Sequence, residues 1–183
     1  MTVKTSNIYQ FKITLKKIKP KIWRRIQVPA DYDFEDLHLA IQKAMGWGNY
    51  HLHQFEMWSP RFGCKVTIGT SECDELETKA KVAKYFLSTS DKALYEYDFG
   101  DGWEHDITLE KILPAVAGSK YPQCIAGERA CPPEDCGGVF GYENLLEIIS
   151  DPKHDEYEDH MDWLVGKFNP EDFDPKSVKF GHL

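Results

Sequence analysis

The segment YEYDFGDGWEH, residues 95–105, decides how this chain is expected to fold. Two runs with strand character, 93–98 and 103–110, flank Phe99-Gly100-Asp101-Gly102. An Asp-Gly pair between two such runs is a strong signal for a β-hairpin, because glycine readily adopts the positive φ that tight turns need. The segment therefore predicts an antiparallel hairpin that turns at residues 99–102.

The sequence before the hairpin predicts two strands and a helix. Residues 8–16 alternate apolar and polar side chains, which is typical of a half-buried strand, and residues 21–28 form a second such run before Pro29. Asp33 is expected to cap a helix over residues 34–45, where apolar side chains recur at helical spacing.

The other elements complete an α+β pattern. We expect strands at 50–58 and 64–69, a short helix at 78–87, a loop rich in Gly, Pro and Cys at 118–140, and helices at 142–150 and 156–167. Strands in hairpins mixed with helices predict an α+β fold, in which a mixed, mainly antiparallel sheet is packed by several helices. One domain over residues 1–183 is expected, since no linker divides the chain.

Composition narrows the class of protein. The longest apolar runs fall well short of the roughly 20 residues that cross a bilayer, and residues 1–10 contain no signal-peptide stretch. A cytoplasmic protein without a membrane partner is therefore expected. The odd number of cysteines, five, favours free thiols over a disulfide framework.

Charge is distributed unevenly along the chain. Residues 1–30 contain eight Lys or Arg and no acid, so the remaining residues carry 22 − 8 = 14 basic and 30 acidic side chains. Nucleic-acid binding through the basic strands is one hypothesis, with contacts from Lys12, Lys16, Lys19, Lys21 and Arg25. It is not favoured, because the net charge of −8 repels phosphate at long range.

The hairpin is the first candidate site. Asp98, Asp101 and His105 could hold a divalent cation or act as acid and base, beside the aromatic ring of Trp103. The favoured alternative is structural: both aspartates satisfy backbone N–H groups in the turn, and Trp103 packs in the core.

The loop GERACPPEDCGG, residues 127–138, is the second candidate. Its prolines and glycines could present Arg129, Glu134 and Asp135 on a rigid backbone, or form a structural lid over buried thiols. The spacing of Cys124, Cys131 and Cys136 lacks the paired knuckles of structural zinc sites, so neither a metal nor another cofactor is expected there.

Three further residues need partners. His51 and His53 share a face if residues 50–58 form one strand, and hydrogen-bonded histidines at the edge of the core are favoured over metal ligands. Arg24 falls on the apolar face of the second strand, and we expect it to pair with Asp98 or Asp101.

Four motifs together resemble the plasmid pRiA4b ORF-3-like family. In chain order they are PKIWRRI at residues 20–26, MGW at 45–47 followed by HLHQF at 51–55, YDFGDGWEH at 97–105, and the loop at 127–138. The resemblance extends from about residue 9 to 173 and implies an α+β protein of similar size. It implies no established activity and no agreed catalytic residues, and the resolvase-like name of some members is not transferred, because no serine-recombinase pattern is present.

The leading functional hypothesis is a binding or interaction module for an unknown small molecule or protein. Its pocket would lie where the hairpin meets the loop at 129–135, with Trp103 as an apolar wall and Arg24 or Arg129 as an anion contact. The alternative is a metal-dependent hydrolase or nuclease, with His105 as base and oxygen ligands from Asp98, Asp101, Glu134 and Asp135. No Walker, Gly-x-Ser-x-Gly or His-Glu-x-x-His motif supports nucleotide hydrolysis, acyl transfer or zincin proteolysis.

Overall fold

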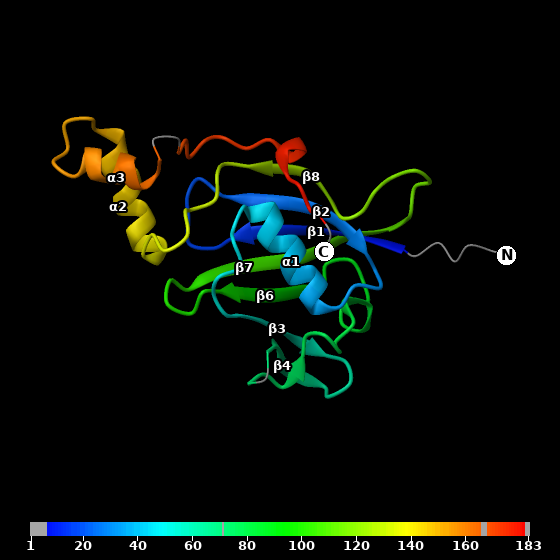
Figure 1. Cartoon of the computed structure of the whole chain (residues 1–183). Coiled ribbons are helices and arrows are strands. Elements are labelled where there is room, and N and C mark those ends of the chain that lie inside the picture. Colours follow the sequence, from blue (N-terminus) through cyan, green and yellow to red (C-terminus); the bar gives the residue numbers. More distant parts are fainter. Residues whose placement is uncertain (1–6, 71, 166–167, 182–183) are drawn as a thin grey trace.

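The computed structural model describes residues 7–70, 72–165 and 168–181. Its centre is an eight-stranded sheet in the order β5-β4-β3-β6-β7-β1-β2-β8 (Figure 1). The strands are β1 Asn7–Leu15, β2 Trp23–Pro29, β3 His53–Ser59, β4 Cys64–Gly69, β5 Glu75–Leu76, β6 Lys92–Tyr97, β7 Trp103–Pro114 and β8 Gln123–Glu128. All neighbours are antiparallel except β4 and β5, which confirms the expected mixed, mainly antiparallel α+β fold.

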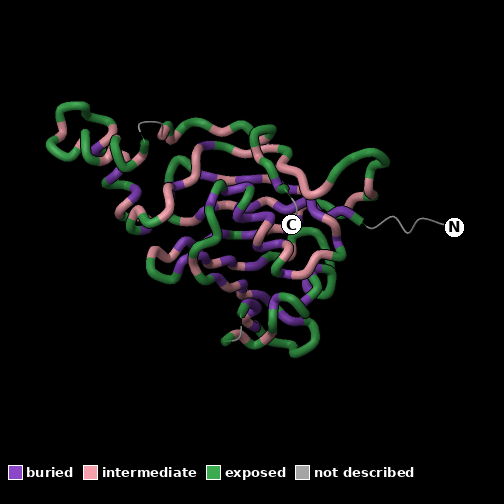
Figure 2. Tube along the Cα trace, viewed as in Figure 1, coloured by how far each residue is buried: buried purple, intermediate pink, exposed green. Residues whose placement is uncertain are grey.

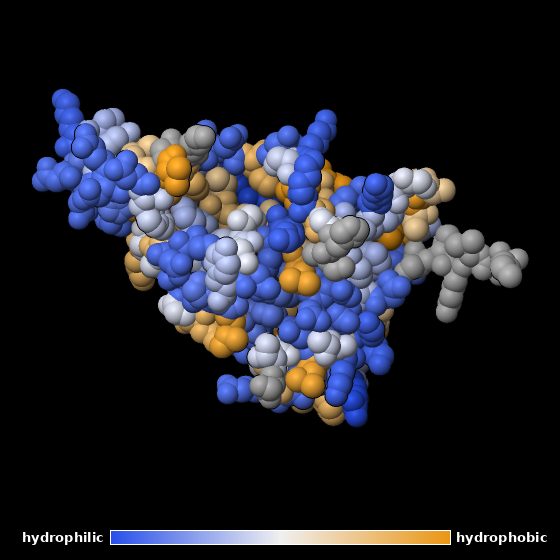
Figure 3. Space-filling view, viewed as in Figure 1, coloured by the Kyte–Doolittle hydropathy of each residue, from blue (hydrophilic) through white to orange (hydrophobic). Residues whose placement is uncertain are grey.

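The helices do not all cover the sheet. Helix α1 (Phe34–Met45) packs on one face, whereas α2 (Gly138–Ser150) and α3 (Tyr157–Trp163) lie beyond the end of the sheet (Figure 1). Buried positions concentrate in the sheet and α1 (Figure 2), while the α2–α3 end is mostly hydrophilic (Figure 3). Helix α1 is thus the helix that packs on the sheet; α2 adds Tyr142 and Leu145 to the core, and α3 adds no buried residue. Within the described part of the chain, no helix is both long and apolar enough to cross a bilayer.

The hairpin forms as expected. Strands β6 and β7 pair with Tyr97 opposite Trp103, and the N–H of Gly102 donates to the carbonyl of Asp98 at 2.6 Å. Asp98 (φ 56°) and Gly102 (φ 66°) have left-handed backbone conformations, which Asp and Gly tolerate better than most residues. Strand β7 then continues to Pro114 and pairs with β1.

Helix α1 begins and ends where the sequence predicts. Asp33 and Asp36 form a capping box, in which each carboxylate accepts from the backbone N–H of the other residue, at 3.0 and 3.2 Å. Gly46 ends the helix at φ 94°.

Other boundaries were predicted wrongly. Residues 78–87 contain a β-bridge at Lys81 and one 3₁₀ turn, η1 (Val82–Lys84), because pairing with Asp33 replaces the expected helix. The expected loop at 118–140 contains β8, which joins the sheet edge although its sequence does not alternate. Helix α2 begins at Gly138, four residues before its predicted start at residue 142. Helix α3 ends at Trp163 and not at residue 167, although residues 166 and 167 lie outside the described residues.

Arg24 has partners other than the predicted carboxylates. The side chain is 1% exposed, and its guanidinium donates to the carbonyls of Ala44, Trp23 and Glu128, each at 2.9 Å. The guanidinium also stacks 3.6 Å from the ring centroid of Phe173. The predicted pairing with Asp98 or Asp101 is therefore wrong, because an acceptor in the last turn of α1 lies closer. Arg24 instead joins α1, β2 and β8.

Replacing Arg24 by Met should destabilise the fold by about 2–4 kcal/mol, because it removes the guanidinium from one buried and two partly buried carbonyls. Arg24→Lys is the matched variant: it keeps the charge but cannot reach three carbonyls, and it should lose a similar amount. Urea unfolding measures both. A Met variant as stable as the wild type would show that these bonds do not hold the three elements together.

Candidate functional site

The hairpin turn and the loop at 127–138 lie in contact. The carboxylate of Asp101 accepts from the N–H of Gly137 at 3.2 Å. A Cβ atom at Gly138 would lie 2.4 Å from the carbonyl oxygen of Asp101, so only glycine permits this approach. Gly138 also has φ 67°, which a side chain would strain further.

A third segment, residues 46–52 after α1, completes the site. The indole N–H of Trp47 donates to the carbonyl of Pro132 at 2.9 Å, and the N–H of Gly48 donates to Glu134 Oε1 at 2.7 Å. The N–H of Tyr50 donates to the hydroxyl of Tyr97 at 3.0 Å. These bonds fix the segment between the loop and the β6–β7 hairpin.

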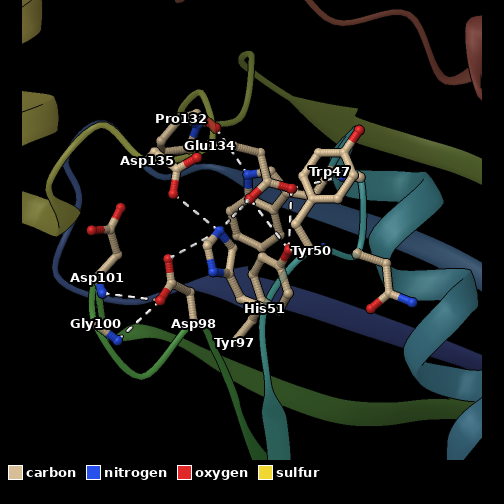
Figure 4. Close-up of polar contacts among 12 residues, drawn as sticks. Trp47, Tyr50, His51, Tyr97, Asp98, Gly100, Asp101, Pro132, Glu134 and Asp135 are labelled. Atoms are coloured by element: carbon tan, nitrogen blue, oxygen red, sulfur yellow. Dashed lines mark hydrogen bonds and ion pairs between the residues drawn. The ribbon is translucent and has the colours of Figure 1, made fainter.

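His51 lies at the centre of the carboxylates (Figure 4). Its Nε2 is 3.0 Å from Asp135 Oδ1, 3.6 Å from Asp98 Oδ2 and 3.9 Å from Glu134 Oε2. The same atom is shielded from solvent and makes no hydrogen bond within the described residues. We refer to His51, Asp98, Glu134 and Asp135 as the acidic cleft.

Neighbouring groups orient the carboxylates of the acidic cleft. Asp98 Oδ1 accepts from the N–H of Gly100 at 2.9 Å, which leaves Oδ2 toward His51. The hydroxyl of Tyr97 donates to Glu134 at 3.1 Å. Burial, together with the charge of Glu134, raises the pKa of Tyr97 to about 12, so the hydroxyl keeps its proton at neutral pH.

Strained backbone marks the same place. Asp98 and Asp135 have φ values of 56° and 57°, and Asn49 has 59°. Left-handed non-glycine residues are uncommon, and they cluster where surrounding structure fixes a functional geometry. Here Asp98 and Asp135 turn their side chains toward His51, whereas Asn49 turns its side chain toward His38.

His51 was predicted to be a core-edge histidine, and that prediction is wrong. Strand β3 starts at His53, so His51 lies in the bend before the strand and not within it. His53 itself is buried and bonds Glu77 at 2.6 Å, as expected of a core histidine. Gly46 and Gly48 are the sequence signal for this outcome, because a turn that follows the helix delays the next strand.

The structure brings together four of the eight predicted site residues, namely Asp98, Asp101, Glu134 and Asp135. The other four have different surroundings. Trp103 and His105 are 1% and 0% exposed and pack beside Trp47 in the core. Burial lowers the pKa of His105 to about 4. Arg129 donates to Glu171 and to the carbonyl of Pro20, both at 2.9 Å, and Arg24 bonds the carbonyls described above.

The basic strands carry few unpaired charges. Lys16 lies 2.7 Å from Glu104, and Arg25 lies 2.6 Å from Glu110. Lys12 lies over the ring of Trp23. These contacts engage three of the five side chains that were candidates for nucleic-acid binding, and they weaken that hypothesis.

Exposed apolar side chains flank the acidic cleft along the chain. Tyr50 and Leu52 adjoin His51, Phe99 follows Asp98, and Phe140 lies in the first turn of α2. All four are at least half exposed. Exposed apolar side chains beside a few converging polar groups are typical of binding surfaces. We refer to these four side chains as the apolar rim.

The chain resembles proteins of unknown function over nearly its whole length. A family model described as "Plasmid pRiA4b ORF-3-like protein" matches residues 7–177. A curated relative from Sinorhizobium fredii, "Uncharacterized protein y4hQ", is 33% identical in an alignment of 182 residues that covers 97% of this chain and 89% of that protein. A crystal structure of "Protein of Unknown Function MM3350" from Methanosarcina mazei Go1 is 51% identical, with a TM-score of 0.89 over 96% of this chain and 99% of that one.

The contact between Gly138 and Asp101 can be tested with a matched pair of variants. Gly102 also has φ 66°, but a Cβ there would meet nothing within 4 Å. Gly102→Ala should cost about 1 kcal/mol of backbone strain. Gly138→Ala adds the clash and should cost at least about 1 kcal/mol more. Equal stabilities in urea unfolding would show that the two backbones are not in contact.

Proposed function

The chain belongs to the plasmid pRiA4b ORF-3-like family, and we propose that this member binds a divalent metal ion in the acidic cleft. His51 Nε2, Asp98 Oδ2 and Asp135 Oδ1 are the proposed ligand atoms, and Glu134 Oε2 lies within reach as a fourth. Asp101 is assigned a structural role, because its carboxylate bonds the backbone of Gly137.

One observation carries the proposal: a nitrogen shielded from solvent faces three carboxylate oxygens and makes no hydrogen bond. Leaving a buried polar atom unpartnered costs about 1–3 kcal/mol. A cation between these groups accepts the nitrogen lone pair and removes that cost. The ligand atoms of His51, Asp98 and Asp135 all lie within 4.8 Å of one another.

The distances suit a first-row transition metal. Two ligands about 2.1 Å from a tetrahedral zinc ion lie about 3.4 Å apart. The separations of 3.0, 3.6 and 3.9 Å between His51 Nε2 and the oxygens bracket that value. One imidazole with several carboxylates is a ligand set that suits Zn²⁺ or Mn²⁺.

Electrostatics favours the same conclusion. Asp98, Glu134 and Asp135 converge on His51, which can offset at most one negative charge. Like charges this close destabilise one another, and a divalent cation compensates them. The donors that hold Glu134, from Tyr97 and Gly48, act as outer-shell groups that fix ligand orientation.

The leading hypothesis from the sequence was a binding module without a metal, and metal ligation by these carboxylates belonged to the alternative; the proposal combines the binding role of the first with the metal ion of the second. The side chain of Asp135 is 68% exposed, so one side of the acidic cleft is open to a ligand. The apolar rim suits a ligand that combines an oxygen donor with an apolar group. The hydrolase hypothesis uses the same carboxylates but has weaker support, because the proposed base His105 is buried in the core.

Metal binding should depend on His51. Calorimetric titration of chelator-treated protein with Zn²⁺ and with Mn²⁺ should give one site, and His51→Gln should weaken it by at least about 100-fold. His154→Gln is the control, because His154 lies in the turn between α2 and α3. Absence of heat for the wild type, or equal losses in both variants, would refute the proposal.

Tyr97 should act on the metal through Glu134 and through the backbone of Tyr50, both of which its hydroxyl bonds. Tyr97→Phe removes the hydroxyl that donates to Glu134 and should weaken binding about tenfold while leaving the stoichiometry unchanged. Circular dichroism of the metal-free variant separates this effect from misfolding. Unchanged affinity in a folded variant would exclude an outer-shell role for Tyr97.

A further inference from the structure

A cavity separate from the acidic cleft lies where β3 ends beside β5 and η1. Its volume is about 360 Å³, and its polar lining consists of Ser59, Arg61, Glu75, Lys79, Lys84 and Tyr85. None of these residues belongs to the acidic cleft. In Figure 1, β3 and β4 lie below the centre of the sheet, whereas α2 and α3 lie at the upper left.

We propose that this cavity binds a phosphate group. The sites are independent, so the proposal does not rest on metal binding. Three cations and one carboxylate line the cavity, which gives it a net positive charge in a chain whose total is −8. A positive, concave site in an acidic protein attracts anions locally.

The cations are available to a ligand. Among the residues that the structure describes, Arg61, Lys79 and Lys84 form no ion pair. The lysine between them in the chain, Lys81, bonds Asp33 at 3.0 Å and does not line the cavity. Lysine and arginine are the side chains that proteins use most for phosphate.

Ser59 supplies the observation that points most directly to a ligand. The residue is 0% exposed, lines the cavity, and its Oγ has no hydrogen-bond partner in the described residues. Buried hydroxyl groups are almost always bonded. An anion oxygen in the cavity would accept the proton of this hydroxyl.

Tyr85 adds a second donor. Burial raises the pKa of its hydroxyl, its interaction with Glu75 raises it further, and Ser59 and Arg61 oppose this effect. The hydroxyl therefore keeps its proton at neutral pH. When an anion occupies the cavity, it can replace Glu75 as the acceptor of that proton, beside Ser59 and the three cations.

Glu75 selects phosphate among anions. Its Oε1 is shielded from solvent and lacks a hydrogen-bond donor within the described part of the chain. Inorganic phosphate retains at least one O–H group near neutral pH, since its second ionisation lies in that range. Sulfate has no such proton and would meet Glu75 oxygen against oxygen. Glu75 thus accepts from phosphate and repels sulfate.

Calorimetry at low ionic strength tests the site with sodium phosphate and with sodium sulfate. We expect phosphate to bind with a Kd of about 1 mM or tighter, and sulfate to bind at least about tenfold more weakly. Glu75→Gln should narrow this difference, because glutamine can donate to either anion. His51→Gln should leave phosphate binding unchanged, which separates this site from the acidic cleft.

Matched lysine variants distinguish a built site from general attraction. Lys79→Gln and Lys84→Gln should each weaken phosphate binding about tenfold, and Ser59→Ala several-fold. Lys81→Gln removes the same charge from the same segment and should change the affinity by less than about twofold. The absence of phosphate binding, equal losses in Lys79→Gln and Lys81→Gln, or equal affinities for phosphate and sulfate would overturn the proposal.

The source of the phosphate is decided by adding glycerol 2-phosphate as a third titrant. The ester is mostly a dianion without an O–H group at neutral pH, so it cannot donate to Glu75. Weaker binding than that of inorganic phosphate is therefore expected and would identify the free ion as the ligand. Tighter binding would contradict the role assigned to Glu75.

Discussion

The close approach of Gly138 to the carbonyl of Asp101 is the constraint on which the acidic cleft depends. It holds the loop at 127–138 against the hairpin turn, with no side chain between the two backbones. Glu134 and Asp135 precede this contact in the loop, and Asp98 precedes Asp101 in the turn. Fixing one contact between the two segments therefore brings three carboxylates into one region.

The histidine of the acidic cleft depends on a buried polar network behind it. His38 bonds the hydroxyl of Tyr95 at 2.8 Å and Asn49 at 2.7 Å, and Gln42 accepts from the N–H of Asn49 at 3.1 Å. Burial lowers the pKa of His38 to about 4, so the ring is neutral at neutral pH. Such fully bonded networks specify one arrangement, which here anchors α1 to the segment that carries His51.

Local signals predicted the fold where they were sufficient. Asp-Gly fixed the hairpin turn, and Asp33 with Gly46 fixed both ends of α1, because these residues act through their own backbone. The edge strand β8 and the partners of Arg24 could not be predicted, because both depend on register between distant segments. The sequence predicted the carboxylates of the acidic cleft but not its histidine. Alternation along β7 already indicated that His105 shares the core face of Trp103. The place of His51 depends on the contact between three segments, so it became visible only in the three-dimensional structure.

Two proposed sites of opposite charge thus lie in different parts of one chain. The central claim is that the acidic cleft binds a divalent metal ion. The most direct test is anomalous diffraction at the zinc edge from crystals of the chain grown with Zn²⁺. A peak within about 2.5 Å of His51 Nε2, Asp98 Oδ2 and Asp135 Oδ1 is expected. An acidic cleft that holds only water while zinc binds cysteines or histidines elsewhere would contradict it.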